Sequence, residues 1–199
     1  MELGQSVIHN QTYSYLPHQV INLDETALNW AIGPTHMYIP AEIRRAESEV
    51  STDEKARVTL VPAIDAAGCS LPLYFIIKHT VAASETDLTS VRVIKALNQK
   101  PGFTRAEGWQ HKLWQRTIGG NNWTIQYLHN IHTGHIVTSQ HKAWNDTPRM
   151  AMYIDLILKP QKAARGGKLA VWMDNCKIHK TVEMMALFAE AGYSTLRNI

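Results

Sequence analysis

Apolar positions in this chain form short continuous runs in some places and stripes at helical spacing in others. One run of five apolar residues, 169–173, lies between a glycine pair and Asp174. A second short run begins the segment 20–25 and leads into Asp24. Such runs, bounded by glycine or an acid, are typical of strands buried on both faces. We therefore predict two central strands, each with an aspartate at its carboxyl end, where open α/β sheets bind ligands.

Further short runs predict strands that pair as hairpins. Residues 57–64 and 71–78 are rich in β-formers and are joined by a short segment that contains Gly68, which predicts a hairpin. Residues 123–128 and 135–138 predict a second hairpin. A turn at Gly33–Pro34 precedes a predicted short edge strand over 36–39. Between 81 and 122 the periodicity is poor.

Two segments have the spacing of helices. Asp146 is a suitable N-cap, Pro148 fits the first turn, and an apolar stripe runs from Met150 to Leu158 before Pro160, where we expect the helix to end. A second helix is predicted over 180–191 and stops at Gly192. Its expected buried face consists of Val182, Met185, Ala186 and Ala189. A last strand is expected from Tyr193, and the element order predicts an α/β fold with a mixed sheet flanked by helices.

Composition supports one globular domain. The 199 residues are 45% hydrophobic and 19% charged, which excludes a disordered chain. We expect a polar leading segment over 1–19 and the domain over 20–199. The net charge of +3 is compatible with a nucleic-acid partner without demonstrating one. No apolar run is long enough to span a membrane and no signal peptide is visible, so an intracellular chain with two reduced thiols is expected.

The two strand-end aspartates are the candidate chemistry. Two carboxylates about 4 Å apart repel by on the order of 4 kcal/mol at an effective dielectric near 20, so they need a proton or a cation between them. Hard oxygen ligands favour Mg²⁺ or Mn²⁺. Asp65 is a weaker metal candidate, because aspartate is common at hairpin turns for backbone reasons. The three histidines over 129–135 suggest zinc, but residues three apart on a strand point to opposite faces.

Four stretches together resemble a known family. LDETALNW around Asp24, the hairpin ARVTLVPAIDAAGCSLPLYFIIK, the helix AWNDTPRMAMYIDLILKP and WMDNCKIH around Asp174 occur in that order. They are similar to the catalytic domain of the pogo/Tigger/jerky branch of the DDE transposases, the DDE superfamily endonucleases. The resemblance covers roughly residues 20–199, with a poorly matching insert at about 81–122.

This resemblance implies a ribonuclease-H-like fold and metal-dependent DNA strand cleavage followed by strand transfer. Asp24 would bridge two Mg²⁺ or Mn²⁺ ions and Asp174 would hold one. Asn175 and His179 match family positions beside the second acid and would orient it, although His179 could equally cap the next helix. DNA is the implied partner and the nucleus the implied location. A homodimer is left open, and no organic cofactor is expected.

The chain departs from the family pattern in its third acid. The family places that acid on a helix after the last strand, whereas Glu183 and Glu190 lie in the helix before it. We therefore expect the domain to be truncated before the third acid and its metal site to be incomplete. One alternative is a domesticated, catalytically inactive DNA-binding or scaffold protein derived from a transposase. Another is a different phosphohydrolase with two aspartates on adjacent strands.

Candidate DNA contacts come from basic residues. Arg44 and Arg45 form an adjacent pair, while Lys112 and Arg116 lie among tryptophans, a composition typical of strand-binding surfaces. An exposed charged face is the commoner meaning of the arginine pair. For the second group, packing of residues 109–116 on the core as one helical turn is the favoured interpretation.

Overall fold

Strands built from the predicted apolar runs dominate the structure. The computed structural model describes residues 14–29, 57–78, 108–174 and 181–197. Its described strands form a four-stranded sheet, in the order β10-β9-β1-β4, and a six-stranded sheet, in the order β2-β3-β5-β8-β7-β6. The strands are β1 (Val20–Leu23), β2 (Thr26–Asn29), β3 (Arg57–Val61), β4 (Ala63–Asp65), β5 (Tyr74–Lys78), β6 (Trp109–Ile118), β7 (Asn121–Asn130), β8 (Ile136–Gln140), β9 (Leu169–Met173) and β10 (Tyr193–Arg197).

The four-stranded sheet is mixed. Strand β1 runs parallel to β9, which in turn runs parallel to β10, whereas β4 is antiparallel to β1. The predicted first hairpin is confirmed, since β3 pairs antiparallel with β5. The second is confirmed by the antiparallel pairing of β7 with β8. The structure is thus a mixed α/β fold, as predicted.

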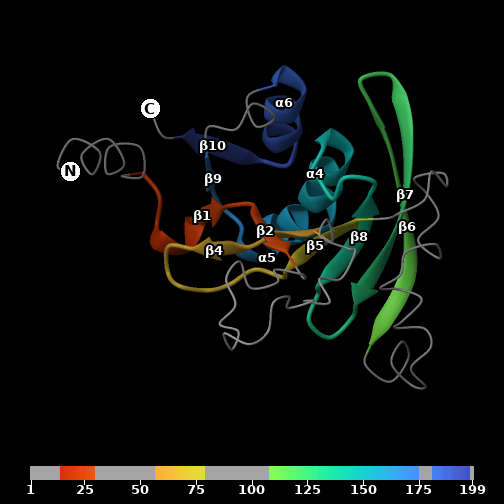
Figure 1. The fold of residues 1–199 in the computed structure, drawn as a ribbon. Helices are drawn as coiled ribbons and strands as arrows, with labels where there is room; N and C mark the ends of the chain where they lie inside the picture. The colour runs from red at the N-terminus through yellow and green to blue at the C-terminus, as the bar shows by residue number, and fades with distance from the viewer. Residues whose placement is uncertain (1–13, 30–56, 79–107, 175–180, 198–199) are drawn as a thin grey trace, which may run out of the picture.

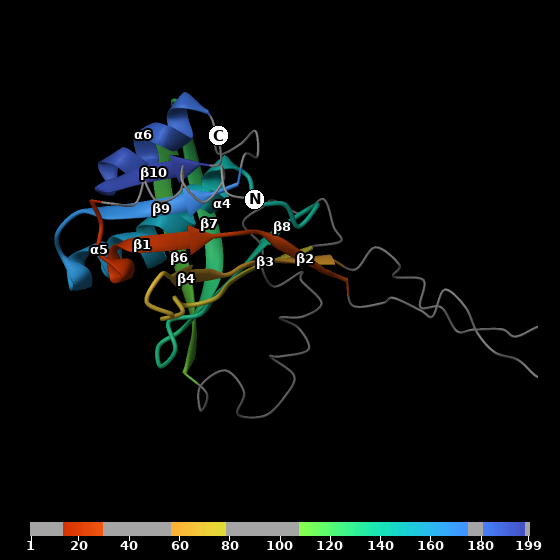
Figure 2. The same ribbon diagram turned by 90° about the vertical axis from the view of Figure 1, so that its left-hand side faces the viewer.

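The two sheets are joined where two neighbouring chain segments pass from one sheet into the other. Strands β1 and β2 are separated only by Asp24 and Glu25, and β3 and β4 only by Pro62. Proline has no N–H to donate to a strand ladder, and its carbonyl instead accepts from the Asp24 backbone N–H at 3.3 Å. Figure 2 shows both segments crossing side by side. Asp24 therefore lies at the junction of the sheets.

One long helical segment lies between the four-stranded sheet and the β6–β7 hairpin (Figure 1). It consists of α4 (Thr147–Tyr153), a π-helical turn η3 (Ile154–Leu158) and α5 (Lys159–Arg165). Asp146 caps it as predicted, accepting from the Arg149 backbone N–H at 3.1 Å. On the sheet side, the Tyr193 hydroxyl donates to the Leu158 carbonyl at 2.7 Å.

Proline does not end this helix, so the predicted end at Pro160 was wrong. Pro160 lies in the first turn of α5, directly after η3. A π-helical turn changes the hydrogen-bond pattern of the preceding residues, and a proline at the start of the next helical segment removes an N–H that the new turn does not require. The segment therefore continues to Arg165.

Helix α6 (Val182–Glu190) and strand β10 follow as predicted, but the buried face of the helix was wrong. Met184, Leu187 and Phe188 are buried, whereas Val182 is 85% exposed. Two neighbouring apolar stripes compete on this helix. Burial stabilises in proportion to apolar area, so the stripe with the larger side chains faces the core.

Residues 109–116 form part of β6 rather than the predicted helical turn. All ten residues of β6 pair with β7, and this pairing overrides the weak local helical spacing. The expected insert over 81–122 thus contains a described strand, and the rest of it up to residue 107 lies outside the described residues. The predicted strand over 36–39 and Cys176, one of the two cysteines, also lie outside the described residues.

The core lies on one face of the four-stranded sheet. Ile21, Leu23 and Val171 are buried beneath the helices, whereas Asn22 of the opposite face is exposed and Trp172 is half-buried. The expectation that both central strands are buried on both faces was therefore wrong for β1, because Asn22 on that face lines a pocket with Tyr15 and Pro17 instead of a packed layer. No described helix is long and apolar enough to cross a membrane.

Candidate functional site at the carboxyl edge of the sheet

The two predicted acids end neighbouring parallel strands. Leu23 of β1 pairs with Met173 of β9, so Asp24 and Asp174 are the next residues along each chain. Neighbouring strands lie about 4.8 Å apart, and both aspartates are exposed. The register thus brings together two carboxylate-bearing residues 150 positions apart at one edge of the sheet.

Backbone groups of neighbouring segments hold Asp24 in place. Its N–H donates to the Pro62 carbonyl, and its Oδ1 accepts from the Glu25 N–H at 2.8 Å. The second oxygen of this carboxylate accepts no hydrogen bond from the described residues, and the residue is exposed. Such an arrangement fixes the position of the side chain while leaving oxygen lone pairs for a cation.

Glu25 connects this edge to the start of α4. Its Oε1 accepts from Asn145 Nδ2 at 2.7 Å. Asn145 is only 6% exposed, and its Oδ1 is buried with no hydrogen-bond partner among the described residues. Buried acceptors are seldom left unpaired. This oxygen is therefore suited to accept from an ordered buried water. Sequence reasoning missed Asn145; the available signal was a polar residue directly before the N-cap.

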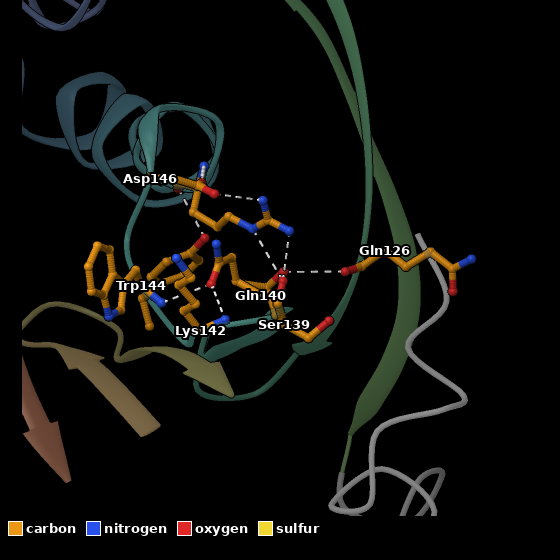
Figure 3. A network of polar contacts seen from close by, with 9 residues as sticks. Gln126, Ser139, Gln140, Lys142, Trp144 and Asp146 are labelled. Atoms are coloured by element: carbon orange, nitrogen blue, oxygen red, sulfur yellow. Dashed lines mark hydrogen bonds and ion pairs between the residues drawn. The ribbon is translucent and has the colours of Figure 1, made fainter. Parts of the chain in front are cut away.

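Arg149 fixes the start of α4 from inside the core. Its side chain is fully buried, with Nε and Nη2 donating to the Ser139 carbonyl at 3.2 and 2.8 Å. Nη1 contacts Asp146 Oδ2 at 3.0 Å, as Figure 3 shows. The Tyr74 hydroxyl donates to the Arg149 carbonyl at 3.0 Å. Burial raises the pKa of Tyr74 well above its ordinary value, so this donor stays protonated.

The basic residues proposed to contact DNA are only partly described, and both described ones contact protein groups. Lys112 Nζ lies 3.0 Å from His129 Nδ1. Arg116 Nη1 and Nη2 lie 2.6 and 2.5 Å from carboxylate oxygens of Asp155 and Glu190, respectively. Arg116 thus joins the hairpin to the helices. Arg44, Arg45, Asn175 and His179 lie outside the described residues.

The alternative metal candidates have other partners. Asp65 Oδ1 accepts from the N–H groups of Ala67 and Cys69, and Oδ2 lies 2.6 Å from Arg165 Nη1. Burial opposes its ionisation, but the Cys69 N–H and Arg165 lower its pKa below the ordinary value. The structural interpretation of Asp65, a carboxylate that holds a hairpin turn, is confirmed.

The histidines over 129–135 contact separate partners. His135 Nδ1 accepts from the Leu73 N–H at 3.0 Å, while burial and the Lys112 ammonium lower the pKa of His129. Within the described ranges, no group of three or more His, Cys, Asp or Glu side chains could hold a metal ion.

No family model matches the chain, and neither does any curated protein. Among solved structures, the chain is similar to a Mos1 transposase paired-end complex with the left transposon end, at 10% identity and a TM-score of 0.45, over 98% of this chain and 40% of that one. It is similar to the Mos1 strand transfer complex at 9% identity and a TM-score of 0.45, over 98% of this chain and 39% of that one. It is also similar to the Mos1 mariner paired end complex with Mn at 10% identity and a TM-score of 0.45, over 98% of this chain and 40% of that one. The chain thus spans about two fifths of the length of those transposases.

Proposed function

We propose that this chain is a DDE transposase catalytic domain of the pogo/Tigger/jerky type, which cleaves DNA phosphodiester bonds with a divalent metal ion and transfers the DNA end. The observation that carries the proposal is the register of β1 against β9, with Asp24 and Asp174 directly after paired residues. The family motifs around both acids supply the reaction type, and a nuclear location follows from the same family.

Each residue of this edge has a distinct proposed role. Asp24 and Asp174 would bind Mg²⁺ or Mn²⁺ through carboxylate oxygens. Glu25, held by Asn145 at 2.7 Å, would fix the chain beside Asp24. The unpaired Oδ1 of Asn145 would accept from the attacking water or hydroxyl, or from a metal-bound water.

The donor set fits a hard cation. Both exposed side chains supply only oxygen, and Mg²⁺ commonly uses one or two carboxylates and completes its shell with water and substrate phosphate. A bound ion would activate the attacking water or 3′-hydroxyl and stabilise the leaving oxygen. The two carboxylates would hold the scissile phosphate at the sheet edge through that ion. The charge of the ion would also offset the repulsion between the carboxylates.

Calorimetric titration with Mn²⁺ tests the site. We expect the chain to bind Mn²⁺ and the Asp24→Asn and Asp174→Asn variants to lose most of that binding, since each removes one of two anionic ligands. Glu190→Gln is the matched control: it also removes one negative charge, but from the end of α6, where Glu190 contacts Arg116 and Lys159. Binding that is equal in all four proteins would contradict the assignment.

A nicking assay on supercoiled DNA tests the reaction. Mn²⁺-dependent nicking that disappears in both Asp→Asn variants supports a nuclease. The second candidate is a domesticated DNA-binding or scaffold protein. It is favoured by the position of Glu183 and Glu190 on α6, before β10, where Glu190 contacts Arg116 and Lys159. DNA binding without nicking and without Mn²⁺ binding would support this candidate instead.

A further inference from the structure

A surface loop between β8 and α4 presents an aromatic ring beside a positive charge. Trp144 is 56% exposed, and the Lys142 ammonium lies 5.4 Å from the centre of its ring. Tryptophan is highly buried on average, so an exposed fraction above one half is uncommon for this residue type. Within the described chain, this ring is the exposed aromatic side chain that also lies beside a cation.

The backbone of this loop is fixed by buried contacts. Gln140 Oε1 accepts from the N–H groups of Lys142 and Trp144 at 2.6 and 3.2 Å. Ala143, between them, is buried and has a φ of 54°, the only positive φ of a non-glycine residue in the described chain. The Thr59 hydroxyl donates to its carbonyl at 2.5 Å. Left-handed backbone at a non-glycine residue costs free energy and persists where surrounding contacts determine it.

The fixed backbone sets the direction in which the Trp144 side chain leaves the loop. In Figure 3 the Trp144 ring points away from the polar network formed by Gln140, Ser139 and Asp146. Preorganised groups of this kind lose little conformational entropy on binding. The ring is therefore suited to binding a ligand at a low cost in conformational entropy.

The residue that carries this ring is linked to Asp24 by a short chain of contacts. Trp144 precedes Asn145, whose Nδ2 donates to Glu25 at 2.7 Å, and Glu25 follows Asp24. Aromatic rings stack on unpaired bases of any sequence, and neighbouring cations contact the phosphates. An aromatic–cation pair beside phosphodiester chemistry suits a single-stranded nucleotide better than a duplex, whose bases are already stacked.

We propose that Trp144 is a stacking platform for an unpaired nucleotide base next to the cleavage site, and that Lys142 contacts an adjacent phosphate. The proposal rests on the proposed function only in taking DNA as the substrate, because stacking requires no metal ion. The pair would hold the strand end in register with Asp24 and Asp174.

Binding of short single strands in EDTA tests the platform without the metal site. The probes are a fluorescent oligothymidylate and an abasic deoxyribose-phosphate strand of the same length. We expect Trp144→Leu to weaken oligothymidylate binding about tenfold, within the range for loss of one stacked base. Trp144→Tyr, which keeps an aromatic face, should bind within about threefold of the parent chain by the same reasoning.

Controls separate stacking from folding and from charge. Leu113→Ala truncates another exposed apolar side chain, 53% exposed on β6, and should leave binding unchanged. On the abasic strand, Trp144→Leu should bind as tightly as the parent chain. Lys142→Gln should reduce the slope of log affinity against log salt by about 0.7, the value for one phosphate contact on a single strand.

The proposal is overturned if Trp144→Leu binds oligothymidylate as tightly as the parent chain, or if it weakens binding to the abasic strand by the same factor. If the parent chain neither binds Mn²⁺ nor nicks DNA, the proposed nuclease function is refuted, but the effect of Trp144→Leu on oligothymidylate binding still stands. Conversely, nicking with no effect of Trp144→Leu would refute only the platform.

Discussion

Arg149 is the largest fully buried side chain among the described residues, and it carries a charge. Its guanidinium satisfies the Ser139 carbonyl and contacts Asp146. Removing one partner of a buried charged pair is costly because the groups left behind remain desolvated and unpaired. The start of α4, and with it Asn145, depends on this contact.

We therefore expect Arg149→Met to lower the free energy of unfolding by about 3 kcal/mol, as measured by urea denaturation. Methionine keeps most of the volume, so the loss reports the polar contacts rather than a cavity. Arg149→Lys, which keeps the charge with fewer donors, should lose less. Equal stability of Arg149→Met and the parent chain would show that the Ser139 carbonyl finds another donor.

The Asp65 carboxylate makes stability depend on pH. Its pKa in the folded chain is lowered by the Cys69 N–H and by Arg165, against the opposing effect of burial. A folded-state pKa below the unfolded value of about 3.9 stabilises the fold above that pH, and the stabilisation disappears as pH falls through the folded value.

Asp65→Asn should thus lower stability at pH 7 by about 1.5–3 kcal/mol, the range for a hydrogen bond to a charged group. The difference from the parent chain should shrink towards pH 3. Urea midpoints at both pH values measure it. If the difference in stability between Asp65→Asn and the parent chain instead grows towards pH 3, the pKa of Asp65 is not lowered in the folded chain.

At the level of single residues, the sequence predicts what lies at strand ends and misses what depends on distant partners. Asp24 and Asp174 were identifiable because each follows an apolar run. Asn145 was not, since its partner Glu25 is 120 positions away. The same holds for Arg116, whose acidic partners belong to helices that local pattern does not bring to β6.

Helix α6 begins at a threonine cap. Thr181 Oγ1 accepts from the Met184 N–H at 3.2 Å, which satisfies one of the amides left unpaired at a helix start. Thr181→Ala should cost about 1 kcal/mol in thermal or urea unfolding, while Thr181→Ser, which keeps the hydroxyl, should cost much less. Similar losses in both variants would attribute the effect to the methyl group instead of the cap.

Elements were predictable in type and less so in extent. The strands at 20–23 and 169–173, both hairpins and the start of α4 follow from short apolar runs and cap chemistry. The extent of α5 does not, because Pro160 normally marks an end and only the π-helical turn before it lets the segment continue. Strand β6 escaped prediction because its long pairing with β7 outweighs an ambiguous local pattern.

Across the whole molecule, the β6–β7 hairpin is attached to the helices by charge. Arg116 contacts Asp155 and Glu190, the Trp114 Nε1–H donates to Asp155 at 3.0 Å, and Lys159 Nζ lies 2.8 Å from the same carboxylate. Burial opposes ionisation of Asp155, but these donors lower its pKa below the ordinary value. The carboxylate is therefore ionised at neutral pH and central to the contact.

Arg116→Met should increase amide hydrogen exchange in β6 and β7 while leaving β1 and β9 protected, because it removes a link between the hairpin and the helices and none within the four-stranded sheet. Exchange followed by mass spectrometry resolves these regions. Glu190→Gln, which leaves the Asp155 contact in place, should have a smaller effect. Uniformly faster exchange over both sheets would indicate global destabilisation instead of local release.

Strand β6 ends the six-stranded sheet, with no further strand beyond it in the described chain. A ten-residue edge presents unpaired N–H and C=O groups to any other extended polypeptide, and long edges of this kind favour self-association. Its exposed residues include Gln110, His111 and Lys112, whose polarity and charge make such pairing less favourable. Substitutions that raise the hydrophobicity of this strand would consequently lower solubility before they altered any chemistry at the acids.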